Sequence, residues 1–375
     1  MKKTPISASI PRRDFLKTVA FAGAAIGFPT ILPSSVFGQN APSNRIHLGL
    51  IGMGLQMKGH ADTMLQTKGV QVMAVCDVYR DRRETWKAHV EKSYAAETAS
   101  GSYKGCDAYN EYERILDRKD IDAVMVVTPD HWHVPISLAA VRAGKDVYVE
   151  KPLILTVREG RQLCDAVKQY GAVLQVGSQQ RSDSCFRRAA EIVRNGWIGK
   201  VREVQLCLGE FPPPDPMPEE AIPDGFDYDR WLGSTPWIPY NSQRVLSNFG
   251  SGWRRYWEYG SRKQGDWGAH HFDITQWALG MDESGPVEFM PRNFQGNNLQ
   301  THTYANGTVV TRVNKLMPGR LSDEYMIRFI GETGEVLVAR GDSIETTPAN
   351  LIKRPLSASD TVSYTHLTLP TIYSV

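Results

Sequence analysis

Residues 46–54 read IHLGLIGMG, an apolar stretch that runs directly into a glycine–methionine–glycine turn. The pattern predicts a β-strand followed by an amphipathic helix. Glycine at both ends of the turn keeps it tight and lets the main chain approach a pyrophosphate at the positive N-terminus of that helix. The third glycine of the usual GxGxxG pattern is absent, because Met57 takes its place. On its own, this stretch is a weak indication that Gly52, Met53 and Gly54 bind a dinucleotide.

A second apolar stretch, residues 70–76 (VQVMAVC), ends at Asp77. A carboxylate at this point accepts hydrogen bonds from both ribose hydroxyls of NAD and repels the 2′-phosphate of NADP. We therefore expect NAD to be preferred. NADP remains an alternative, because nearby guanidinium groups are able to reach a phosphate, namely those of Arg80, Arg82 and Arg83.

Strand and helix patterns then alternate along the chain. Apolar strands are expected over residues 121–128, 146–149 and 172–176, with helices over 134–143 and 156–170. Such alternation predicts right-handed strand–helix–strand units and a parallel sheet. Ligands of these sheets bind beyond the carboxyl ends of the strands. The candidate residues that fall there are Asp77, Thr128, Pro129, Asp130, Glu150 and Lys151.

The pattern changes after residue 177. A helix is expected over residues 184–195, and alternating or β-branched strands over 199–206, 307–313, 324–330 and 335–339. These strands are separated by turns, which favours a mainly antiparallel sheet. The prediction is an α/β Rossmann domain with a doubly wound parallel sheet over residues 44–177. An α+β domain for substrate binding or oligomerisation follows over residues 178–360.

The composition is that of a soluble globular protein. Hydrophobic residues make up 41% and charged residues 22% of the 375 residues. Lys plus Arg (43) nearly equals Asp plus Glu (41), so no basic surface for nucleic acid or membranes is expected. Aromatic residues are frequent between Trp231 and Trp277, where they either stack on sugar rings or pack between loops. The five cysteines include no CxxC pair, and we expect buried thiols.

The first 38 residues resemble a signal peptide. Arg12 and Arg13 precede an apolar stretch over residues 18–31, which is too short and too rich in glycine and proline for a membrane span. A twin arginine in this position is typical of the twin-arginine export route, so we expect that machinery as a partner and a periplasmic or otherwise exported protein. The alternative is an ordinary N-terminal helix.

The opposite end of the chain has another unusual feature. Residues 362–371 read VSYTHLTLPT, which matches a frame translation of a transposon-based sequencing-library adapter. We expect residues 361–375 to be such an artefact and the native C-terminus of the second domain to be missing.

Two further stretches supply reactive side chains. Residues 144–153 read GKDVYVEKPL and place Lys151 at the end of an apolar strand, and residues 265–273 read GDWGAHHFD. The spacing of Asp266 and His270 puts both on one face of a helix. Their stripe would continue through Asp273 and Trp277.

These residue types suit the oxidation of a secondary alcohol. A histidine is a good base for the hydroxyl proton, and a carboxylate one turn away orients it. A lysine beside the cofactor polarises the forming carbonyl. The alternative is that Asp266 and His270 are satisfied polar groups in a helix packed on the sheet. His271 points about 100° away from His270 and is expected at the rim or in a structural role.

Candidate substrate ligands lie further along the chain. Gln180, Arg181 and Trp253 are candidates for binding sugar hydroxyls or a carboxylate, as are the residues that follow Trp253. Structural salt bridges account for the arginines equally well.

The motifs GLIGMG, AVCD, TPDHWH, AGKDVYVEKPL and DWGAHHFD occur in this order and resemble the Gfo/Idh/MocA family of NAD(P)-dependent oxidoreductases. The resemblance covers about residues 44–360. It implies a Rossmann domain and a sheet domain whose exposed face often mediates oligomers, so we expect a homo-oligomer. It also implies that Lys151, Asp266 and His270 act at the nicotinamide. His133 then belongs to a loop with nicotinamide contacts, and we expect no metal there.

The expected function is that of an oxidoreductase acting on a sugar, polyol or sugar derivative. A second hypothesis is a glycoside hydrolase that oxidises the sugar transiently at C3 with a tightly bound NAD. Export favours the latter, because the periplasm has no abundant NAD pool. A third is a sugar-binding relative without catalysis, which the three reactive residue types disfavour.

Changing Arg12 and Arg13 together to Lys should retain the protein in the cytoplasm with its activity intact, because the export route reads the arginine pair. Cell fractionation followed by immunoblotting measures this. If the double variant still reaches the periplasm, the twin-arginine prediction is wrong.

Overall fold

The computed structural model describes residues 45–360, except residues 215, 247, 294–298, 315–324 and 358–359. All elements discussed below belong to one compact unit that begins at Ile46. The predicted signal peptide and the adapter-like tail lie outside the described residues. No helix among the described residues is long and apolar enough to cross a membrane.

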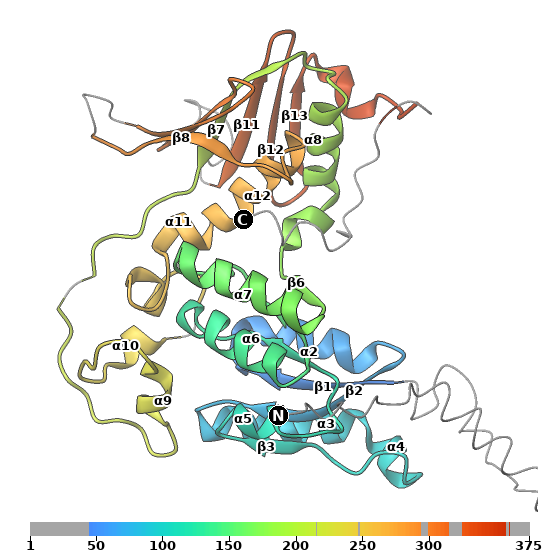
Figure 1. The fold of residues 1–375 in the computed structure, drawn as a ribbon, viewed down its shortest axis with the longest axis vertical. Coiled ribbons are helices and arrows are strands. Elements are labelled where there is room, and N and C mark those ends of the chain that lie inside the picture. Colours follow the sequence, from blue (N-terminus) through green and yellow to red (C-terminus); the bar gives the residue numbers. More distant parts are fainter. Residues whose placement is uncertain are drawn as a thin grey trace, which may run out of the picture. The chain divides into compact units, whose positions relative to one another are not determined.

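The first domain is built on a six-stranded parallel sheet with the order β3-β2-β1-β4-β5-β6 (Figure 1). The order reverses between β1 and β4, which is where ligands of doubly wound sheets bind. This confirms the predicted Rossmann fold. The strands are β1 (Ile46–Ile51), β2 (Val70–Cys76), β3 (Asp107–Tyr109), β4 (Ala123–Val126), β5 (Asp146–Val149) and β6 (Leu174–Val176).

Helices cover both faces of this sheet because its strands are apolar on both sides. In β4, Val124 and Val126 pack with helices α6 and α7, whereas Met125 packs with α2 and α3. The helix α7 begins with a capping box between Thr156 and Glu159 and ends at Gly171, whose φ is 66°. The helices are α2 (Leu55–Gln66), α3 (Arg80–Ser93), α4 (Ala95–Ala99), α5 (Glu113–Leu116), α6 (His133–Arg142) and α7 (Val157–Tyr170), with the 3₁₀ turn η3 (Asp130–Trp132).

The second domain contains a seven-stranded sheet with the order β13-β12-β11-β7-β10-β9-β8. Its neighbouring strands are antiparallel except β7 and β10, which confirms the predicted α+β domain. The strands are β7 (Val201–Cys207), β8 (Pro286–Met290), β9 (Gln300–Tyr304), β10 (Val309–Val313), β11 (Met326–Gly331), β12 (Glu335–Ala339) and β13 (Ser343–Thr347).

Two helices pack on one face of the second sheet. They are α8 (Ser184–Arg194) and α12 (Gly268–Ala278). Phe186 of α8 and Trp277 of α12 share a core with Val204 and Phe329 from the strands. This core fixes α12, which carries one of the predicted catalytic residues. The remaining short elements are η4 (Gln179–Ser182), α9 (Tyr228–Leu232), α10 (Ser242–Val245), η5 (Gly252–Arg255), α11 (Arg262–Asp266) and η6 (Ala349–Lys353).

The residues just before α9 contact the first domain, although they follow β7 of the second domain in the chain. Phe226 forms an antiparallel bridge with Tyr79, and their rings stack with centroids 4.8 Å apart. Arg230 of α9 pairs with Glu111 at 2.9 Å. Aromatic residues of this segment also pack with one another, as Trp231 does with Tyr259 at 4.9 Å. The aromatic residues that follow Phe226 therefore supply packing, as one of the two interpretations expected.

The position of the missing third glycine is part of the core. Met57 lies on α2, is fully buried, and packs with Leu50 of β1 and with Val72 and Val75 of β2. The thioether side chain of Met57 therefore fills the space between α2 and the sheet. A glycine at this position would instead allow the helix to lie closer to the sheet. Gly59, two residues further along and on the exposed side of α2, has open space around it.

We expect Met57→Ala to lower the free energy of unfolding by about 2–5 kcal/mol, because it leaves a cavity in the core. The matched variant Gly59→Ala should raise it by about 0.5–1 kcal/mol, because alanine restricts the unfolded chain and fits an exposed helix. Urea unfolding of both variants measures the two effects. Equal stability of Met57→Ala and the unsubstituted protein would show that α2 does not depend on this contact.

Candidate active site

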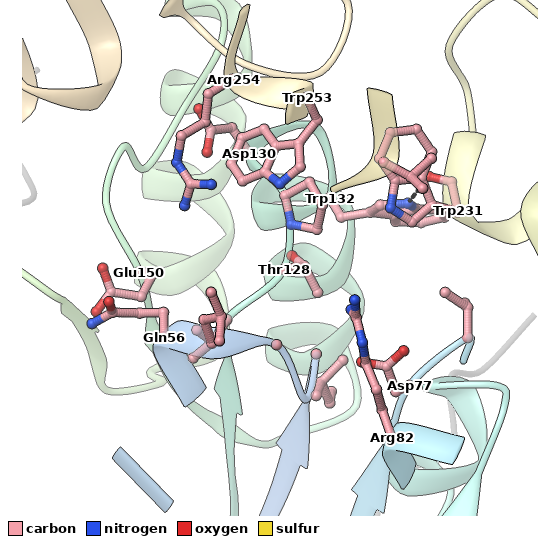
Figure 2. Close-up of a pocket in the computed structure, with 18 of the residues that line it drawn as sticks. Gln56, Asp77, Arg82, Thr128, Asp130, Trp132, Glu150, Trp231, Trp253 and Arg254 are labelled. Carbon is pink, nitrogen blue, oxygen red and sulfur yellow. Dashed lines mark hydrogen bonds between the residues drawn. The ribbon is translucent and has the colours of Figure 1, made fainter. Parts of the chain in front are cut away.

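A cavity of about 330 Å³ lies beyond the carboxyl ends of β1, β2, β4 and β5. Both domains contribute to its lining. Figure 2 shows Asp77 and Arg82 near the ends of the strands, whereas Trp253 and Arg254 project from the opposite side. Further lining residues are Gly52, Gly54, Thr128, Pro129, Asp130, Glu150, Lys151, Trp231, Asp266, Trp267, His270 and Arg340.

The turn after β1 fits the pyrophosphate of a dinucleotide. Gly52 has a φ of 88°, and a Cβ atom there would lie 2.6 Å from the carbonyl oxygen of Val127. Only glycine is therefore tolerated at this point. Gly54 is the N-cap of α2, where no side chain caps the helix. The free N–H groups of the first helical turn face the cavity side and are suited to an anionic ligand.

Asp77 lies where the ribose of the dinucleotide is expected. Its two oxygens accept hydrogen bonds from the main-chain N–H groups of Met53 and Tyr79, both at 2.7 Å. Burial raises the pKa of Asp77, and the neighbouring Arg82 opposes that shift. A carboxylate oxygen accepts more than one hydrogen bond, so both oxygens keep capacity for ribose hydroxyls.

The loop after β4 offers polar atoms to a ligand. Thr128 lines the cavity, and its buried hydroxyl has no hydrogen-bond partner among the described residues. An orphaned hydroxyl of this kind suits a ligand that supplies the missing partner. Pro129 lines the cavity beside it.

Glu150, at the end of β5, is held in place by several donors. It contacts Nε2 of His60 at 2.8 Å and accepts hydrogen bonds from the Tyr148 hydroxyl at 3.0 Å and the Lys151 N–H at 3.1 Å. Burial would raise its pKa, but the charges and hydrogen bonds of His60 and its neighbours lower it overall. Glu150 is therefore an ionised carboxylate at the wall of the cavity.

His133 lies behind the cavity and does not line it. Its Nδ1 is 2.7 Å from the carbonyl oxygen of Pro152, and its Nε2 is 3.0 Å from that of Thr128. Burial lowers the pKa of His133, so the ring is neutral and donates to one of these carbonyls at a time. The structure gives this residue a bracing role between the two loops that carry Thr128 and Lys151.

Lys151 and Asp266 form the ion pair at the centre of the site. Nζ of Lys151 lies 2.8 Å from Oδ1 of Asp266 and donates a second hydrogen bond to its carbonyl oxygen at 3.1 Å. Nε of Arg254 lies 3.7 Å from the same Oδ1. The peptide bond between Lys151 and Pro152 is cis, so the lysine stands at an unusual turn. The ion pair joins the end of β5 to the second domain.

His270 completes this group. It is 5% exposed and lines the same cavity, and its imidazole makes no hydrogen bond to any described residue. Burial lowers the pKa of His270 to about 2, and the charges of Lys151 and Arg340 add to the shift. The imidazole is therefore neutral, with a nitrogen available to accept a proton from a ligand.

Of the four residues in the predicted helical stripe, two face the cavity and two face the core of the second domain. Asp266 is the last residue of α11 and His270 lies in the first turn of α12, because the helix breaks at Trp267. Both still face the cavity. Asp273 and Trp277 instead face Arg181, which donates to both oxygens of Asp273 at 2.8 and 2.7 Å and whose guanidinium lies 5.4 Å from the Trp277 ring.

Three of the predicted substrate ligands lie away from the cavity lining. Arg181 is 2% exposed and also pairs with Asp282 at 2.9 Å, so it is part of a buried ion-pair network. His271 is fully buried against Phe186 in the core of the second domain. Gln180 is buried and accepts a hydrogen bond from Nε of Arg340 at 3.1 Å. Trp253 and the following Arg254 are predicted substrate ligands that do line the cavity.

Two other lining residues had no role assigned from the sequence. Asp130 follows Thr128 and Pro129 at a strand end, where the sequence placed it on the ligand side of the sheet. Burial raises the pKa of Asp130 to about 7, although Lys151 and Arg254 oppose the shift. Arg340 lies between β12 and β13, where no pattern in the sequence marks it.

In the described part of the chain, no group of three or more His, Cys, Asp or Glu side chains converges in a way that would hold a metal ion. The five cysteines, all of which are described, form no disulfide, and four of them are buried.

Two family models match the chain. The first, "Oxidoreductase family, NAD-binding Rossmann fold", matches residues 46–178, and the second, "Oxidoreductase family, C-terminal alpha/beta domain", matches residues 214–311. The chain is also 31% identical, over 176 residues, to the alpha-N-acetylgalactosaminidase of Shewanella oneidensis. That alignment covers 43% of this chain and only 38% of the relative.

Solved structures share the fold at low sequence identity. The WlbA dehydrogenase from Bordetella pertussis, in complex with NADH and UDP-GlcNAcA, has a TM-score of 0.53 and 20% identity, over 78% of this chain and 79% of that one. Levoglucosan dehydrogenase, in complex with NADH and levoglucosan, has a TM-score of 0.53 and 19% identity, over 80% and 76%. The two family models together match more than half of the 375 residues, and the chain belongs to the Gfo/Idh/MocA family of NAD(P)-dependent oxidoreductases.

Proposed function

We propose that this protein oxidises a secondary hydroxyl group of a sugar, polyol or sugar derivative, with NAD as the hydride acceptor. The observation that carries the proposal is the convergence of Lys151, Asp266 and His270 in the cavity that also holds the glycine turn and Asp77. A proton-handling group thus lies beside the elements that fit a dinucleotide.

NAD, when bound, takes the hydride from the carbon that carries the hydroxyl group. The residues of this chain handle the proton and the charge. His270 is neutral and accepts the hydroxyl proton. Lys151 directs a remaining N–H toward the same oxygen and stabilises the negative charge that develops on it. Asp266 fixes the lysine through the 2.8 Å contact.

A carbohydrate is the substrate class that best suits the walls of this cavity. The indole rings of Trp132, Trp231 and Trp253 line it, and flat aromatic faces stack on sugar rings. Two family relatives of known structure bind sugar derivatives, as their complexes with UDP-GlcNAcA and levoglucosan state.

The second candidate is glycoside cleavage with a retained NAD that is reduced and reoxidised in each cycle. The similarity to an alpha-N-acetylgalactosaminidase favours it. A specific feature of the site supports it as well. Asp130 has a pKa raised to about 7 and lies in the cavity, so its carboxyl group is able to protonate a leaving group at neutral pH. The expected export to the periplasm, where NAD is scarce, would require such a tightly held cofactor.

Two measurements distinguish the candidates. The protein is first purified without added nucleotide, and any bound nucleotide is extracted and identified. It is then incubated with a panel of sugars and aryl glycosides while nicotinamide absorbance and aglycone release are followed. Net NADH formation supports the oxidoreductase. Aglycone release without net NADH supports the glycosidase, and neither change with any compound contradicts both.

We also propose a homo-oligomer formed through the second sheet. Val287 and Phe289 of β8 are 69% and 68% exposed, which is unusual for large apolar side chains on a strand. Sedimentation analysis of the purified protein measures its oligomeric state.

Lys151→Ala and His270→Ala should each lower kcat by a factor on the order of 100 or more, because each removes a positioned acid–base group. Nucleotide affinity should change little. The matched control for the histidine is its neighbour: His271→Ala should lower the melting temperature, since that ring is buried in the core, and leave kcat largely unchanged. Near-normal turnover in both Lys151→Ala and His270→Ala would place the chemistry elsewhere.

Asp77→Ser should weaken NAD binding and improve NADP binding relative to NAD by a factor on the order of 10 or more, because it removes a charge that repels the 2′-phosphate. Asp77→Asn is the control for shape, since it removes the charge and keeps one acceptor, for the Met53 N–H, while it loses the acceptor for the Tyr79 N–H. Titration of the nucleotide-free protein with NAD and NADP gives both affinities. If both variants keep the original preference, Arg82 and its neighbours determine it.

A further inference from the structure

Arg340 is held at the cavity by contacts that leave most of its guanidinium free. The residue lies in the exposed turn between β12 and β13, but its side chain lines the cavity. The guanidinium carbon lies 4.4 Å from the ring centroid of Trp267, which itself stacks on Tyr325 at 3.9 Å. Nε donates to Gln180. The two terminal nitrogens have no hydrogen-bond partner among the described residues and remain available to a ligand.

Arg340 also has no direct ion-pair partner. Lys151 and Arg254 both lie near one carboxylate, Asp266, at 2.8 and 3.7 Å. Arg340 has no carboxylate within 4 Å in the described part of the chain. Burial lowers its pKa, and the more distant carboxylates of Asp266 and Asp183 oppose that shift. An anion bound directly to the guanidinium would offset the cost of its burial.

The positive charges of Lys151 and Arg340 also act on His270. Lys151 and Arg340 both disfavour a proton on its ring, and proton transfer from a hydroxyl group must place one there. An anionic group on the substrate, next to Arg340, would offset the field at the moment when the imidazolium forms. A neutral sugar provides no such compensation.

We propose that the substrate is a uronic acid, free or within a glycoside, and that Arg340 binds its carboxylate. The inference rests on the proposed function and names the substrate class of that same site. A planar guanidinium with two free N–H groups matches a carboxylate in shape and charge. A phosphate monoester would supply the same kind of contact, but its two negative charges would also face Asp130 and Asp266 in this cavity.

The test uses the NAD-loaded protein and three matched sets of probes: glucose, galactose and mannose, their uronic acids, and their 6-phosphates. Single-turnover reduction of the bound nicotinamide is measured for each. In at least one set the uronic acid should show the higher second-order rate constant of nicotinamide reduction. Arg340→Gln should lower that constant on the order of 100-fold, the effect of losing a charge-assisted hydrogen bond. It should not lower the constant for the hexose, because it removes a positive charge that disfavours the proton on His270.

Two further variants control for charge and for the substitution itself. Arg340→Lys should restore part of the uronic acid activity, because it keeps the charge without the planar fork. Arg202→Gln removes an exposed arginine that pairs with Glu332 outside the cavity, and it should have no effect.

Four results would overturn the inference. Two concern the unsubstituted protein: a preference for the hexose in every set, or a preference for the 6-phosphate. Two concern the variants: an equal loss of activity on uronic acid and hexose in Arg340→Gln, or a loss of activity on the uronic acid in Arg202→Gln. Each leaves the proposed function standing if some sugar is oxidised. If no sugar in any set reacts, the proposed function itself fails, and this inference fails with it.

Discussion

The ion pair between Lys151 and Asp266 is the interaction on which the site depends. One partner ends β5 of the Rossmann domain, and the other ends α11 of the second domain. The lysine is 18% and the aspartate 11% exposed in their side chains, so the pair is largely removed from water and breaking it would leave a costly unpaired charge. The contact therefore joins the two domains at the cavity and holds the ammonium group of Lys151 in its lining.

The electrostatics of the cavity follow from this pair. Two cations, Lys151 and Arg254, lie around one carboxylate, and burial keeps His270 neutral beside them. Asp130 is a further acid near the pair, and its pKa of about 7 means that its charge changes close to neutral pH. The site is thus able to accept a proton at His270 and to hold or release one at Asp130, two roles that alcohol oxidation and glycoside cleavage use differently.

The sequence predicted the elements whose signals are local. The Rossmann strands are apolar on both faces, and the GMG turn and Asp77 follow strand ends, so their positions could be inferred from neighbours in the chain. The spacing of Asp266 and His270 also predicted correctly that both face one side. The helix breaks at Trp267, but the residues before and after the break are helical. Both predicted residues therefore still reach one cavity.

Side-chain partners from distant parts of the chain were not predictable in this way. Arg181 was a reasonable sugar ligand by residue type, but Asp273 and Asp282 bind it in the interior. The strands β9 (QTHTY) and β13 (SIETT) are largely polar, and pairing with neighbouring strands rather than apolar periodicity defines them. The lining of the cavity has the same long-range origin. The turn after β12 supplies Arg340 to one part of the cavity, whereas Gly52, Gly54 and Asp77 come from the first domain. A substitution in that turn is therefore able to change one part of the lining without changing the glycine turn.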